Sequence, residues 1–265
     1  MIEKIYKNSI VEKPKFTLSI LFIILISFSY FAKDFQLDAS SDTLLLENDP
    51  DLKYLREVNE KYKSKDYLVL TYSPKKELLH QSTIDNLTNL KNELENLEWV
   101  NNVTTILDVP LLKNNDDPLA ERIKNFKTLS SENVDKKRGF EEIINSPIYK
   151  EFVISIDGKT SGILAFIKTD EKMSELIKTK NEYLDKIDKK ILDYNDKEKY
   201  KKFLKGYDSY KKIYNQKNHQ NIKEIRNIIE KYKNDAKIHL GGIPMIADDM
   251  MTYVKNDIIV FGAGV

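Results

Sequence analysis

The stretch Glu151–Lys168, EFVISIDGKTSGILAFIK, carries the strongest secondary-structure signal in the chain. Two runs of alternating apolar and polar residues flank the dipeptide Asp157-Gly158, which is typical of the tight turn between two antiparallel strands. The stretch therefore predicts a β-hairpin, and a sheet is expected to form around it.

Upstream of this hairpin, the sequence predicts a strand, a helix and another strand. The strands are expected at residues 67–72 (YLVLTY) and Val100–Leu107, the second ended by Pro110. Between them, apolar residues recur every three or four positions, as on one face of a helix: Ile84, Leu87, Leu90, Leu94 and Leu97. The polar segment 110–150 is interpreted as an insertion with short helices at 118–127 and 132–145, because it contains Pro110, Pro118 and Pro147.

Downstream of the hairpin, a long tract with helical periodicity is rich in lysine and tyrosine. Polar breaks near Asn195 and at Gln216–Asn221 divide it, which predicts a helical hairpin with an insertion at about 171–218. A nucleic-acid surface is disfavoured, because Asp and Glu are interleaved with the lysines and helical packing accounts for the aromatic residues. A short strand, Lys237–Leu240, follows and is broken by Gly241-Gly242.

Without the insertions, the elements follow the order strand, helix, strand, strand, helix, strand. This is the split βαβ or ferredoxin-like arrangement, an α+β fold in which two helices cover one face of an antiparallel sheet. The fold alone does not indicate a function.

The apolar run Phe16–Ala32 (FTLSILFIILISFSYFA) predicts a transmembrane helix, because it holds seventeen residues without a charge. Lysines precede the run and mainly acidic residues follow it, which places residues 1–15 in the cytoplasm and 33–256 outside the cytoplasmic membrane. A cleaved signal peptide is the alternative, with a possible cleavage pattern at Ser27-Phe28-Ser29. The length of the run favours a retained anchor.

The last ten residues, NDIIVFGAGV (Asn256–Val265), predict the start of a second transmembrane helix at 257–265, in a chain that continues beyond Val265. A short buried strand is the alternative, since eight apolar residues cannot separate the two structures. Gly262 and Gly264 favour the membrane helix, because glycine weakens strands and is frequent in packed membrane helices.

Composition and motifs argue against an enzyme. The 43 basic and 42 acidic residues give no global field for a polyanion, and there is no cysteine for a thiol nucleophile or thiolate metal site. The histidines, His80, His219 and His239, lie far apart in sequence. No Gly-x-Ser-x-Gly, phosphate-loop or His-Glu-x-x-His motif is present. We therefore nominate no catalytic, cofactor-binding or metal-binding residue.

The segment Gly241-Gly242-Ile243-Pro244 is interpreted as a corner between a strand and a helix. Either glycine permits backbone angles closed to other residues, and Pro244 suits the first turn of a helix. Asp248 and Asp249 are expected to complement the dipole of that helix.

Three segments in this order resemble the first third of an exporter of the resistance-nodulation-division (RND) superfamily. They are Asp38–Leu70, where an acidic turn and an amphipathic helix (Leu52, Leu55, Val58, Tyr62) precede the first strand, the Ser155–Lys168 hairpin, and His239–Ile258. The similarity is to the branch of the mycobacterial large membrane proteins (MMPL) and the hydrophobe or amphiphile exporters.

The resemblance implies a homo-oligomeric, proton-driven transporter of lipids or other hydrophobic molecules in a bacterial inner membrane, with a periplasmic porter domain. The apolar runs 16–32 and 258–265 hold no ionisable residue, so the proton relay is expected outside this sequence. The alternative function is a single-span, membrane-anchored periplasmic binding or scaffolding protein, which needs only the first apolar run.

Overall fold

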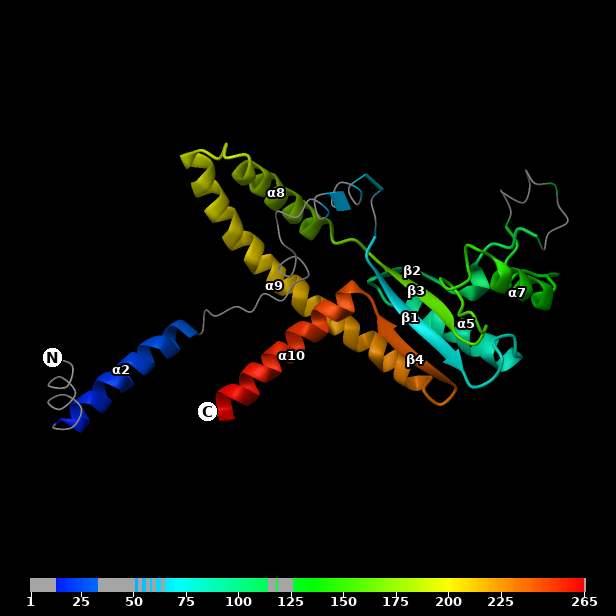
Figure 1. Cartoon of the computed structure of the whole chain (residues 1–265), viewed down its shortest axis with the longest axis horizontal. Coiled ribbons are helices and arrows are strands. Elements are labelled where there is room, and N and C mark those ends of the chain that lie inside the picture. The colour runs from blue at the N-terminus through cyan, green and yellow to red at the C-terminus, as the bar shows by residue number, and fades with distance from the viewer. Residues whose placement is uncertain are drawn as a thin grey trace.

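The computed structural model describes residues 13–32, 65–113, 118 and 126–264, together with six positions between 51 and 62. It is an α+β structure with a four-stranded antiparallel sheet: β1 (Tyr67–Pro74), β2 (Val100–Thr104), β3 (Ser161–Ile167) and β4 (Ala236–Gly241). The strand order is β2-β3-β1-β4. Helix α5 (Gln81–Glu95) joins β1 to β2, and α8 (Glu171–Asp188) and α9 (Tyr194–Lys231) lie between β3 and β4 (Figure 1). The predicted order of strands and helices is confirmed.

The two central strands give the sheet one buried face. Every second side chain is buried in β1 (Leu68, Leu70, Tyr72) and in β3 (Ser161, Ile163, Ala165). Strand β1 pairs with β3 through Leu70 and Ile163, and with β4 through Leu70 and Leu240. The period of two is the reason, since alternate side chains of a strand point to opposite faces.

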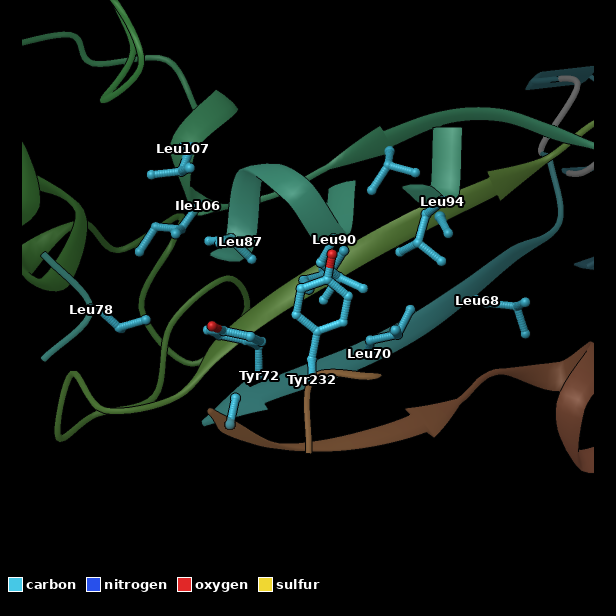
Figure 2. Close-up of a cluster of buried hydrophobic side chains, with 14 of the residues drawn as sticks. Leu68, Leu70, Tyr72, Leu78, Leu87, Leu90, Leu94, Ile106, Leu107 and Tyr232 are labelled. Atoms are coloured by element: carbon cyan, nitrogen blue, oxygen red, sulfur yellow. The ribbon is translucent and has the colours of Figure 1, made fainter. Parts of the chain in front are cut away.

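Helices α5 and α9 supply the other side of the core. Leu87, Leu90 and Leu94 of α5 pack in the same cluster as the buried strand residues, as do Ile222 and Ile225 of α9. Figure 2 shows the leucines of α5 facing Leu70 and Tyr72 of β1, with the Tyr232 ring between them. The predicted apolar face of residues 84–97 is therefore confirmed, with Ile84 and Leu97 at its partly buried margin.

The predicted β-hairpin forms only in part. Its turn is present, with Gly158 at a φ of 67° and Ser155 N–H donating to the Thr160 carbonyl at 2.9 Å. Its first arm is not a strand, however, and its backbone pairs with β3 through the bridge of Ile154 with Ser161 and the Gly162 N–H bond to the Val153 carbonyl. The reason is that β1 pairs with one edge of β3 over residues 161–166, while β2 pairs with the other edge over residues 164–167. Only the start of that second edge is left for the first arm.

Three other predicted boundaries are corrected. Residues 106–108 form the 3₁₀ helix η2 (Ile106–Asp108) rather than the end of a strand. The break expected at Gln216–Asn221 does not occur, because α9 runs unbroken for 38 residues. The break near Asn195 lies slightly earlier, between Asp188 and Tyr194. A single helix therefore belongs both to the predicted insertion and to the cover of the sheet.

The insertion at 110–150 contains α7 (Lys136–Asn145), within the helix expected at 132–145. Most of the helix expected at 118–127 lies outside the described residues, as do the acidic turn after Lys33 and Leu52. Leu55, Val58 and Tyr62, which belong to the predicted amphipathic helix before β1, are helical.

In the described part of the chain, no helix has both the length and the apolar character needed to cross a membrane. This finding corrects the predicted transmembrane helices at 16–32 and from 257 onward. Helix α2 (Pro14–Ala32) has 19 residues, about 28 Å against a hydrocarbon thickness of roughly 30 Å. Helix α10 (Ile243–Gly264) starts well before residue 257 and includes four charged residues: Asp248, Asp249, Lys255 and Asp257.

Tyr72 gives a first testable prediction, because its hydroxyl is buried without a hydrogen-bond partner in the described structure. Burial, with a smaller contribution from Asp235, raises the pKa of Tyr72 to about 12. Tyr72→Phe removes the unsatisfied hydroxyl and keeps the ring, so we expect a free energy of unfolding that is unchanged or higher by about 1 kcal/mol. Urea denaturation measures this, and a loss above 1 kcal/mol would show that the hydroxyl has a partner.

Candidate functional site: the junction of α9 and α10

The corner between β4 and α10 depends on one glycine. Gly242 has a φ of 114°, and a Cβ atom there would lie 2.9 Å from the Tyr67 carbonyl oxygen and 3.1 Å from the Leu68 Cα. At Gly241, the nearest atom to a Cβ would be the Val69 carbonyl oxygen at 3.7 Å, an ordinary contact. The interpretation as a strand-to-helix corner is confirmed, and Gly242 is the residue that it requires.

Polar side chains then hold α10 against α9. Asp248 is only 5% exposed, and its Oδ1 lies 2.8 Å from Nδ1 of His219. Arg226 reaches both carboxylate oxygens of Asp249, at 2.8 and 2.9 Å. Asn218 donates to the Pro244 carbonyl oxygen at 2.9 Å. Together these contacts fix the direction in which α10 leaves the sheet.

This arrangement corrects the expected role of the two aspartates. The first turn of α10 contains no acidic residue, and the helix dipole acts mainly within that turn. Asp248 and Asp249 instead pair sideways with α9. Sequence reasoning missed His219 and Arg226, because no spacing along the chain relates them to α10.

The other two histidines have different positions. His80 precedes α5 as its N-cap, where Nδ1 accepts the Ser82 N–H at 3.2 Å. His239 is exposed on β4. Within the described ranges, no group of three or more His, Cys, Asp or Glu residues is placed to hold a metal ion.

The His219–Asp248 pair gives a second prediction. Replacing His219 with Leu leaves the buried carboxylate of Asp248 without this contact, and we expect the free energy of unfolding to fall by about 1–3 kcal/mol. The double variant His219→Leu/Asp248→Leu is expected to lose less than the single variant, because no buried charge remains. A double-mutant cycle by denaturation measures both, and strictly additive losses would contradict a direct interaction.

The C-terminal end of α9 is anchored to α5. Glu93 accepts from the Tyr232 hydroxyl at 2.9 Å and from the Lys231 ammonium at 2.5 Å. Closer to the junction, Trp99 Nε1 donates to Glu224 at 2.9 Å. The hydrogen bond from Lys231 lowers the pKa of Glu93, whereas burial and the bond to Glu93 raise the pKa of Tyr232. The second half of α9 is therefore tied to the body at several points.

The lowered pKa of Glu93 predicts how the stability of the fold changes with pH. A carboxyl group whose pKa is lower in the folded state stabilises the fold above its unfolded-state pKa, and this stabilisation is lost as the pH falls through the folded-state pKa. Glu93→Gln should thus remove at most about 1 kcal/mol at pH 7, since a partly exposed ion pair is screened. The difference between the two proteins should shrink when unfolding is measured under acidic conditions, and a constant difference would contradict this role.

The first half of α9 pairs with α8 as a helical hairpin, here called the arm. The arm points away from the sheet (Figure 1). Four rings pack α8 against α9 along it, with neighbouring centroids 4.9 to 6.4 Å apart: Tyr183, Tyr200, Phe203 and Tyr207. At its base, the Tyr210 hydroxyl donates to Asp170, the N-cap residue of α8. The lysine- and tyrosine-rich tract is thus explained by packing, as expected from its periodicity.

Beyond the junction, α10 exposes apolar side chains. Ile258, Ile259, Val260 and Phe261 are all exposed, and so are most large apolar residues of α2 between Phe16 and Tyr30. Exposed apolar surface of this extent marks contact with a membrane or a partner. The junction therefore connects the sheet to an apolar helix end.

The chain matches no protein-family model, and no curated protein matches it.

Proposed function

We propose that this chain is the N-terminal, porter-type part of a proton-driven, RND-like exporter of lipids or other hydrophobic molecules. In this proposal the ferredoxin-like body lies on the periplasmic side of a bacterial inner membrane and works as a homo-oligomer. The proposal is drawn from the sequence resemblance. The observation that carries it is the exposure of Ile258–Phe261 at the end of a helix that continues directly from the sheet.

The physical argument starts from the cost of exposed apolar surface. Each apolar side chain left in water forgoes roughly 1.5–3 kcal/mol of burial free energy, so surfaces of this kind are retained where something apolar covers them. Lipid at the membrane is the cover that we propose for α2 and for the end of α10. The contacts of His219 and Arg226 with α10 would then couple any movement of the sheet to the lipid-facing end of that helix.

The orientation can be tested with the cysteine-free chain. A single cysteine replaces Asn101, exposed on β2. A maleimide that cannot cross membranes should label this cysteine in intact spheroplasts. Protection of the cysteine at 101 before lysis would contradict a periplasmic body.

Cargo requires a separate measurement. The protein is purified in mild detergent, and the lipids that travel with it are identified by mass spectrometry. The same lipids should accumulate in the inner membrane when the gene is deleted, since an exporter removes them. Unchanged lipid distribution after deletion would contradict the exporter.

A membrane-anchored binding or scaffolding protein is the second candidate. The arm favours it, because a helical hairpin that projects from the body can serve as a binding element without any transport. This function predicts an unchanged lipid distribution after gene deletion, together with a phenotype when the arm alone is removed.

A further inference from the structure

The tip of the arm exposes apolar side chains where the fold does not need them. Ile187 at the end of α8, Ile191 in the connection and Tyr194 at the start of α9 are 42%, 64% and 81% exposed. The packed rings that hold the arm together begin deeper, at Tyr183 and Tyr200. The three tip residues therefore form an apolar surface outside the packing of the hairpin.

The same tip is basic, unlike the chain as a whole. Between Lys186 and Lys202 there are seven lysines and only four acidic residues, whereas the complete chain has a net charge of +1. Two of the acids serve the fold: Asp193 caps α9, and Asp196 pairs with Lys186 at 3.2 Å. Lys189 and Lys190 are exposed and form no ion pair with another described residue. The surface around the apolar side chains is thus positively charged.

Lys190 also occupies a position that stability alone would not give to lysine. Its φ is 56°, the left-handed conformation that commonly ends a helix and that favours glycine or asparagine. A strained residue of this kind is grounds for a functional hypothesis. A lysine thus stands at a position of the tip where glycine or asparagine would suit the backbone.

The base of the arm lies near the exposed apolar end of α10. Helix α9 meets α10 at Arg226 and Asp249, and the exposed apolar end of α10 starts nine residues later, at Ile258, which is about 14 Å along the helix. From Asn218 to Tyr194, the arm extends about 36 Å. Both elements leave the body from the same junction (Figure 1). The two elements then run in different directions (Figure 1), so a lipid surface at the end of α10 lies near the base of the arm.

We infer that the arm tip binds the surface of an anionic bilayer, with Lys189 and Lys190 at the lipid phosphates and Ile187, Ile191 and Tyr194 in the headgroup interface. Basic residues beside exposed apolar and aromatic side chains are the combination that such surfaces bind. The inference rests on the proposed location of the body at a membrane, but not on export. It gives the protein a second membrane contact besides its apolar helices.

The test uses the full chain with one cysteine, in place of Tyr194, that carries a polarity-sensitive dye. The protein is reconstituted into vesicles of phosphatidylcholine, with or without about one-third phosphatidylglycerol. We expect a blue shift and quenching by spin-labelled lipid only in the anionic vesicles. A probe at position 101 should not respond to the lipid. Equal spectra at position 194 in the two kinds of vesicle would overturn the inference.

Charge variants test whether the tip, rather than another part of the molecule, binds the anionic lipid. Lys189→Glu/Lys190→Glu should raise the phosphatidylglycerol fraction needed for half of the spectral shift by about threefold or more, or abolish the shift. The matched control Lys136→Glu/Lys137→Glu, on exposed residues at the start of α7, should leave it unchanged. Lys190→Gly should weaken the response while the arm remains folded by circular dichroism, since glycine suits this backbone. An equal effect of the α7 control would overturn the inference.

A negative result for the arm tip can be distinguished from a negative result for the proposed function. Membrane association of the whole chain reports on α2 and α10, and it should persist in every tip variant. A photoreactive residue at Ile191 completes the test in cells. Crosslinks to lipid support the inference, whereas crosslinks to a protein alone would overturn it and identify a protein as the partner.

Discussion

A Gly242→Ala variant is expected to unfold with a free energy lowered by about 2–4 kcal/mol. The added Cβ would lie 2.9 Å from the Tyr67 carbonyl oxygen and 3.1 Å from the Leu68 Cα, and both contacts are with backbone. Backbone atoms of a central strand cannot move aside as the end of a flexible side chain can. The φ of 114° adds strain of about 1–3 kcal/mol for any residue with a side chain.

Gly241→Ala is the matched control, one residue earlier in the same corner. Its Cβ would meet only the Val69 carbonyl oxygen at 3.7 Å, and its φ is not positive. We expect a loss below about 1 kcal/mol, since packing and backbone both tolerate it. Chemical denaturation of the two variants measures the difference. Equal losses would show that the corner does not depend on the conformation of Gly242.

The second large effect is expected at Ile225, in the half of α9 that covers the sheet. Ile225 is fully buried in the core with α5 and the strands. Ile225→Ala removes three carbon atoms from a closely packed interior, which costs about 2–5 kcal/mol. The free energy of unfolding from urea titration reports this loss.

Ile213→Ala is the control on the same helix, twelve residues earlier. This side chain is 59% exposed, because it lies on the arm rather than over the sheet. A loss below about 0.5 kcal/mol is expected, as for most surface substitutions. Similar losses at both positions would mean that the arm packs against a surface other than the one described.

The comparison of Ile225 with Ile213 also shows what sequence patterns predict and what they leave undetermined. The three-four spacing correctly predicts helix at both positions, but it does not say which apolar residues face the sheet and which face another helix. The predicted break at Gln216–Asn221 followed from local polarity. Packing overrides that preference, since Asn218 and His219 find partners on α10.

The candidate site was less predictable than the fold. The corner was recognised from Gly241, Gly242 and Pro244, because the backbone needs of a turn are local. The contacts from His219 and Arg226 to α10 join residues that are 29 and 23 positions apart, respectively. No single-sequence pattern encodes such pairs.

The sequence by itself determined most of the segments that become strands and helices, because periods of two and 3.6 reflect the local geometry of the backbone. It also determined the charge-free stretch at 16–32. Only the tertiary structure decided which strands pair, and there β2 occupies most of the β3 edge on which the first arm of the hairpin was predicted. Pairing and burial are settled by the competition between distant segments for the same edges and faces, and that competition exists only once the chain has folded.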